Sequence, residues 1–133
     1  MQLTRRYRFS ASHRLDVAAL SAEENRRLFG KCNNPYGHGH DYLLDVTLAG
    51  TPDESGQVAN RAELDRFVGT SVLQRLEHKN LNTDVPELAA FPPTTENLAA
   101  AIQAMLQTEW PFAARLHRVR ISETNRNIFE LQS

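Results

Sequence analysis

The stretch GHGHDYLLDVTLAG, residues 37–50, decides the fold because polar and apolar side chains alternate along most of it. Successive side chains of a β-strand point to opposite faces of the sheet. One face of the predicted strand is mostly apolar and begins with two histidines: it carries His38, His40, Tyr42, Leu44, Val46 and Leu48. The stretch therefore predicts a half-buried strand with two imidazole rings at one end of its buried face.

Working outward, residues 3–13 alternate in the same way, and His13 ends their apolar face. Asn60 precedes a helical pattern that continues to Leu76, and a threonine cap within PPTTEN (92–97) precedes a second one that continues to Leu106. Two further strands are expected over residues 116–123 and 128–131. The order of two strands, two helices and two strands predicts an α+β fold, in which an antiparallel sheet is backed by two helices on one face.

Length and charge limit the possible functions. The 133 residues fit one domain, residues 1–133, because domains typically contain about 100 to 150 residues. The formal charge of −1 comes from 15 basic and 16 acidic residues that are well mixed, which argues against nucleic-acid or anionic-membrane partners. No run approaches the roughly 18 apolar residues of a membrane span, and the N-terminus lacks a signal core. With Cys32 as the only cysteine, a reducing, cytoplasmic location is expected.

The three histidines at strand ends point to a metal site. Two histidines at i and i+2 present their rings on the same side of a strand, and pairing of the first two strands in a hairpin brings His13 beside them. Three imidazole ligands leave the fourth position of tetrahedral zinc open, as in catalytic sites. The alternative is that each histidine is a hydrogen-bonded structural residue.

Three more groups of reactive or ionisable residues have roles that the sequence pattern leaves open. Cys32 is a fourth metal ligand, a base or nucleophile, or a small buried hydrophobe. Glu77 and His78 form either a carboxylate–imidazole pair or ordinary solvated surface. Glu123 at the end of the third strand is either buried against a specific donor or simply ends the strand, and His117 is taken as structural.

Six motifs in order resemble the 6-pyruvoyltetrahydropterin synthase family across nearly the whole chain. They are FSASHRL (9–15), EENRRLFGKCNNPYGHGHDY (23–42), SGQVANRAEL (55–64), LEHKNLNTDVP (76–86), TTENLA (94–99) and ISETNRNI (121–128). The resemblance implies the tunnelling fold (T-fold), a four-stranded antiparallel sheet with two helices, which forms a trimeric barrel and stacks as a homohexamer.

The resemblance also implies a role for each matching residue. His13, His38 and His40 match the family's Zn²⁺ ligands, and Cys32 matches its catalytic thiol. His78 matches the histidine of a catalytic triad, in which Glu77 stands where the family usually has aspartate. The pterin ring is anchored by a carboxylate and the residues around it, which here are Glu123, Thr94, Thr95 and Glu96.

The implied activity is that of a phosphorus–oxygen lyase. It converts 7,8-dihydroneopterin triphosphate to 6-pyruvoyl-tetrahydropterin in tetrahydrobiopterin biosynthesis and releases triphosphate. One alternative is a 6-carboxy-5,6,7,8-tetrahydropterin synthase of the queuosine pathway, in which three residues usually separate the cysteine from the first histidine, whereas five separate Cys32 from His38 here. The other alternative is an inactive relative that binds only pterin or zinc.

Overall fold

A four-stranded antiparallel sheet forms the centre of the computed structural model, which describes residues 1–35 and 37–133. The strands follow chain order across the sheet, β1-β2-β3-β4. Their bounds are β1 Gln2–His13, β2 His38–Ala49, β3 Arg115–Ser122 and β4 Ile128–Gln132. The predicted strands and their antiparallel pairing are confirmed.

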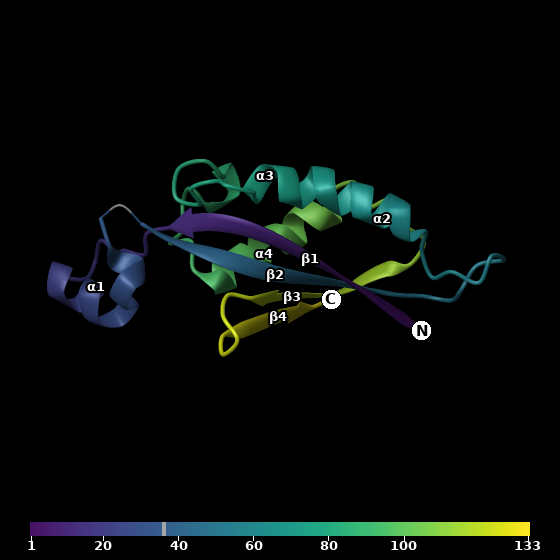
Figure 1. Cartoon of the computed structure of the whole chain (residues 1–133), viewed down its shortest axis with the longest axis horizontal. Helices are drawn as coiled ribbons and strands as arrows, with labels where there is room; N and C mark the ends of the chain where they lie inside the picture. Colours follow the sequence, from purple (N-terminus) through teal and green to yellow (C-terminus); the bar gives the residue numbers. More distant parts are fainter. Residues whose placement is uncertain (36) are drawn as a thin grey trace.

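The helices α2, α3 and α4 lie together on one side of the sheet (Figure 1). The helix α2 (Arg61–Val68) continues through a π-helical turn, η2 (Gly69–Leu73), into α3 (Gln74–Leu76), and α4 spans Thr95–Gln107. The side chains of Asn60 and Thr94 accept hydrogen bonds from the backbone N–H three residues on, so both predicted N-caps are confirmed. A short 3₁₀ helix, η3 (Pro86–Leu88), precedes α4.

The connection from β1 to β2 is not the predicted hairpin. It contains α1 (Ala22–Phe29) and a 3₁₀ helix, η1 (Gly30–Asn33), which lie beyond one end of the sheet (Figure 1). The helix α1 has a capping box between Ser21 and Glu24, and this signal is present in the sequence. Its apolar pattern is weak, and Asn25 is its only buried residue. The predicted turn after Cys32 includes Tyr36, which lies outside the described residues.

The core fills the space between the sheet and the helices. Tyr42, Leu44, Val46 and Leu48 are completely buried, as the alternation in β2 predicts. The alternation of buried and exposed residues in β3 is interrupted once. A register shift at Thr47/Leu48 pairs Leu48 with Leu116 and leaves His117 without a partner in the ladder, so Leu116 enters the core and His117 is half-buried.

Among the residues that the structure describes, no helix combines the length and the apolar character that crossing a membrane requires.

Candidate functional site

The β1–β2 register brings the predicted histidines to one end of the sheet. His13 pairs with His38, the last pair of this ladder, and Ala11 pairs with His40. His13 is 1% exposed, and its Nε2 lies 3.1 Å from Nε2 of His40. The rings of His38 and His40 lie edge to face with their centroids 4.6 Å apart. The three imidazoles are therefore adjacent.

A backbone carbonyl determines the tautomer of His13. Its Nδ1 lies 2.9 Å from the carbonyl oxygen of Pro93, and a carbonyl oxygen only accepts hydrogen bonds. The proton of neutral His13 therefore sits on Nδ1, and the Nε2 lone pair faces His40. A histidine that binds a metal through one nitrogen usually donates from the other in this way.

Cys32 and Glu123 complete a cluster of donor atoms around this nitrogen. The Cys32 Sγ lies 3.3 Å from His13 Nε2 and 3.6 Å from His40 Nε2. One Glu123 oxygen lies 3.1 Å from His40 Nε2, and the other accepts a hydrogen bond of 2.9 Å from the Thr95 hydroxyl. The donor atoms of His13, Cys32, His40 and Glu123 all lie within 4.8 Å of one another.

Burial controls the protonation of this cluster. It lowers the pKa of His13 and His40, although the Glu123 carboxylate acts in the opposite direction on both rings. Burial also raises the pKa of the Cys32 thiol, and the negative charge of Glu123 raises it further. At neutral pH the rings of His13 and His40 are therefore neutral, with lone pairs that can bind an ion, and the Cys32 thiol is protonated.

The donor set fits a divalent transition metal. Two imidazole nitrogens, a sulfur and a carboxylate oxygen are ligand types found at zinc sites, where coordination is tetrahedral. The set differs from the predicted one, because within the described part of the chain His38 is not one of the four clustered donors. The structure thus brings His13 and His40 together with Cys32 and Glu123, and places the His38 ring against that of His40.

Glu77 and His78 form a second, separate constellation. Glu77 contacts His78 Nε2 at 3.1 Å through one oxygen and accepts a 3.0 Å hydrogen bond from the Ser10 N–H through the other. The His78 side chain is 80% exposed and lines a pocket of about 330 Å³, whose lining also includes Ser10, Asp41 and His40. Within the described chain this pair is not part of the Cys32 cluster.

The residues expected around the pterin ring are only partly assembled. Thr95 is buried and bonded to Glu123, Thr94 caps α4, and Glu96 is exposed on the first turn of that helix.

Two functional features were not predicted from the sequence. One is the Pro93 carbonyl, for which no side-chain signal exists. The other is the requirement for glycine at position 37. Gly37 has a φ of +84°, and an added Cβ would lie 3.1 Å from the His13 carbonyl oxygen. Larger residues are therefore disfavoured at this position.

Comparison with known proteins points to one family. The family model described as 6-pyruvoyl tetrahydropterin synthase matches residues 2–133. Human 6-pyruvoyl tetrahydrobiopterin synthase is 48% identical over 128 residues, which cover 96% of this chain and 88% of the human protein. The Drosophila melanogaster enzyme of the same name is 46% identical over 127 residues, 95% of this chain and 76% of the relative.

A solved structure and a more distant relative complete the comparison. The Caenorhabditis elegans 6-pyruvoyl tetrahydropterin synthase superposes with a TM-score of 0.91 at 36% identity, covering 100% of this chain and 95% of that one. A protein of Archaeoglobus fulgidus provisionally named 6-carboxy-5,6,7,8-tetrahydropterin synthase is 30% identical over 86 residues, 65% of this chain and 67% of its own length.

Proposed function

The chain belongs to the 6-pyruvoyl tetrahydropterin synthase family, and from this premise we propose that it converts 7,8-dihydroneopterin triphosphate to 6-pyruvoyl-tetrahydropterin with elimination of triphosphate. The enzyme is a lyase of tetrahydrobiopterin biosynthesis. The observation that carries the proposal is the gathering of His13, Cys32, His40 and Glu123 at one end of the sheet.

The metal in this proposal is Zn²⁺, held by His13, His38 and His40. The contact between the His38 and His40 rings supports the third ligand, because it places His38 next to a member of the donor cluster. Bound zinc supplies positive charge that favours the Cys32 thiolate and acidifies the carbon-bound protons beside the substrate hydroxyls.

Each remaining side chain then has a role that its contacts support. Glu123 accepts hydrogen bonds from the pterin ring, and Thr95 orients this carboxylate through its hydroxyl. Thr94 and Glu96 lie at the start of the same helix and line the ring site. Cys32 takes a carbon-bound proton, and His78, oriented by Glu77, passes protons to and from the side chain of the substrate.

The active molecule is a cytoplasmic homohexamer in this proposal, built from two stacked trimeric barrels. The exposure of the His78 side chain supports such an assembly, since a pocket between two copies would cover it and place it beside the donor cluster of the neighbouring copy. The sheet ends at β1 and β4, and closing a barrel through these strands would remove both edges.

Product analysis tests the reaction. Purified protein loaded with zinc is incubated with 7,8-dihydroneopterin triphosphate, and the pterin and phosphate products are identified by mass spectrometry. We expect 6-pyruvoyl-tetrahydropterin and triphosphate. Acetaldehyde with 6-carboxy-tetrahydropterin would establish the carboxy synthase instead, and unchanged substrate bound to an inert protein would establish a pterin-binding relative.

A further inference from the structure

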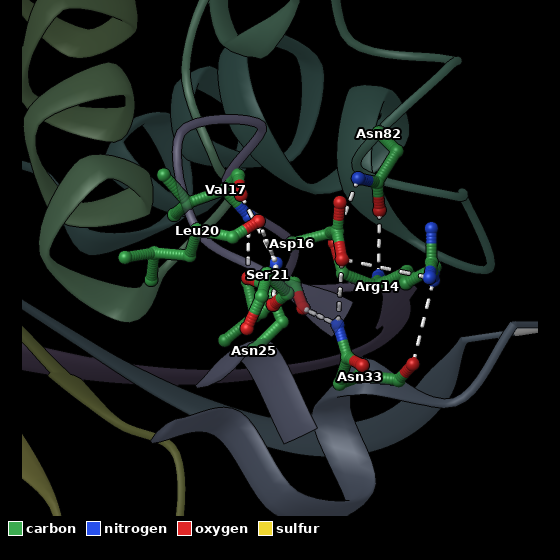
Figure 2. A network of polar contacts seen from close by, with 9 residues as sticks. Arg14, Asp16, Val17, Leu20, Ser21, Asn25, Asn33 and Asn82 are labelled. Carbon is green, nitrogen blue, oxygen red and sulfur yellow. Dashed lines mark hydrogen bonds and ion pairs between the residues drawn. The ribbon is translucent and has the colours of Figure 1, made fainter. Parts of the chain in front are cut away.

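Asn33 directly follows Cys32 in the chain and is buried, with 7% of its surface exposed. Its Nδ2 donates hydrogen bonds to the Leu15 carbonyl at 2.6 Å and to the Asp16 carboxylate at 3.0 Å. The Leu15 N–H in turn donates to the carbonyl of Cys32 at 2.6 Å. Figure 2 shows Asn33 facing Arg14 and Asp16, in the segment that follows the end of β1. Two sets of hydrogen bonds therefore connect Cys32 to this segment. One involves its own carbonyl, and the other involves the side chain of Asn33.

The segment that receives these bonds is itself held in place. The Arg14 N–H donates to the Asn82 side chain at 2.7 Å, and the Asn82 amide donates back to the Arg14 carbonyl at 2.8 Å (Figure 2). The Ser12 N–H also donates to the Lys79 carbonyl, so the chain around His13 is bonded to residues 79–82. Removing the Asn33 side chain would therefore loosen Cys32, which keeps the bond from the Leu15 N–H to its carbonyl, and would leave His13 in place.

The short helix that carries Cys32 has little stability of its own. The helix η1 has four residues and no side-chain cap, and 3₁₀ helices of this length have poor hydrogen-bond geometry. We propose that Asn33 is a positioning residue, which holds the Cys32 sulfur beside the His13–His40 pair by fixing η1 to residues 15 and 16. The proposal rests on the function of Cys32 proposed above.

Asn25 offers a matched control in the same connection. It is also buried, with 2% exposed, and its side chain also bonds to backbone groups, those of Val17, Leu20 and Ser21. These bonds do not involve η1. Asn25→Ala therefore removes four side-chain hydrogen bonds from the same connection, against two for Asn33, and none of the four reaches η1.

Two measurements on the zinc-loaded full chain test the proposal. The first is turnover of 7,8-dihydroneopterin triphosphate. Asn33→Ala is expected to lower kcat by roughly 10- to 100-fold with little change in KM, which is the usual range for loss of a residue that positions a reacting group.

The second measurement is the rate at which N-ethylmaleimide modifies Cys32, the only thiol. This rate is expected to rise roughly five- to tenfold, the effect of losing about one buried hydrogen bond on local opening.

Asn33→Asp leaves no cavity, because its side chain has nearly the same size, but it replaces the donor with a carboxylate that repels Asp16, so both hydrogen bonds are lost. Asn25→Ala is expected to change neither measurement. Equal modification rates for wild type, Asn33→Ala and Asn33→Asp would overturn the proposal whatever reaction the protein catalyses. Equal effects of the Asn25 and Asn33 variants would also overturn it, because they would show a general role in loop stability. An inactive wild type with the expected modification rates would overturn the proposed function alone.

Discussion

At the scale of single residues, the site depends on side chains that are oriented by contacts with residues distant in the sequence. His13 is oriented by the carbonyl of Pro93, 80 residues away. Alternation in the sequence places His13, His38 and His40 on one face and so predicts that they meet. It contains no information on Pro93 or on the Thr95–Glu123 hydrogen bond, because both contacts form only when α4 packs on the sheet.

Metal content separates the predicted ligand set from the observed donor cluster. His13→Ala and His40→Ala are expected to lower the zinc bound per chain to near zero, measured by atomic emission after dialysis, because both rings face the centre of the cluster. His38→Ala gives the same loss if His38 is the third ligand. Zinc retained at the wild-type level in His38→Ala would assign its position to Cys32 or Glu123.

The longer carboxylate of Glu77 is expected to suit this chain. Its two oxygens contact both His78 and the Ser10 N–H, and aspartate at this position would be shorter by one methylene group. Glu77→Asp should therefore lower kcat by about tenfold, as for other residues that orient a catalytic histidine. A variant as active as wild type would show that the carboxylate does not orient His78.

Gly37 is required by its conformation and its surroundings. A Cβ at this position would meet the His13 carbonyl oxygen at 3.1 Å, and φ is +84°. Gly37→Ala is expected to lower the free energy of unfolding by more than about 1 kcal/mol in urea denaturation. Gly56→Ala is the control: its φ is similar at +83°, but nothing lies within 4 Å of the added Cβ. Equal losses in both variants would remove the argument from crowding at His13.

At the scale of the elements, the pairing of β1 with β2 could be predicted, but the connection between them could not. Period-two patterns and two capping residues predict four strands and two helices, and all of these form. The missed helix α1 packs few apolar side chains and is held by polar contacts of Asn25 instead. A bulge in the β2–β3 ladder likewise has no strong sequence signal, because Leu116 and His117 are both compatible with a strand.

An ion pair joins β1 to α2 and makes stability depend on pH. Arg5 donates two hydrogen bonds to Asp65, and these lower the pKa of the Asp65 carboxyl below its ordinary value. Because the folded pKa is the lower one, the contribution of Asp65 is present above the unfolded pKa and is lost as pH falls through the folded pKa. Both side chains are 38% exposed, so the effect is small.

The comparison with Asp65→Asn measures this contribution. The difference in unfolding free energy between wild type and the variant is expected to shrink as pH falls from about 6 to about 3, where the carboxylate becomes protonated. Urea titrations at each pH give this difference. A constant difference across the range would show that Arg5 does not stabilise the ionised form.

At the scale of the whole molecule, one chain brings together the metal donors but leaves the Glu77–His78 pair elsewhere. Sequence patterns describe one chain, so the assembly is implied only by family resemblance. Native mass spectrometry is expected to give six copies of the 15.0 kDa chain. An active monomer would contradict the view that the two constellations meet between copies.

The central claim is that the three histidines at the end of β1 and β2 hold one zinc ion within reach of Cys32. A crystal structure of the zinc-loaded protein, with anomalous data collected on both sides of the zinc absorption edge, tests it most directly. We predict a single strong anomalous peak per chain at about 2.0 to 2.1 Å from nitrogens of His13, His38 and His40, with the Cys32 sulfur beside it. A peak at another site, or none at this one, would contradict the account.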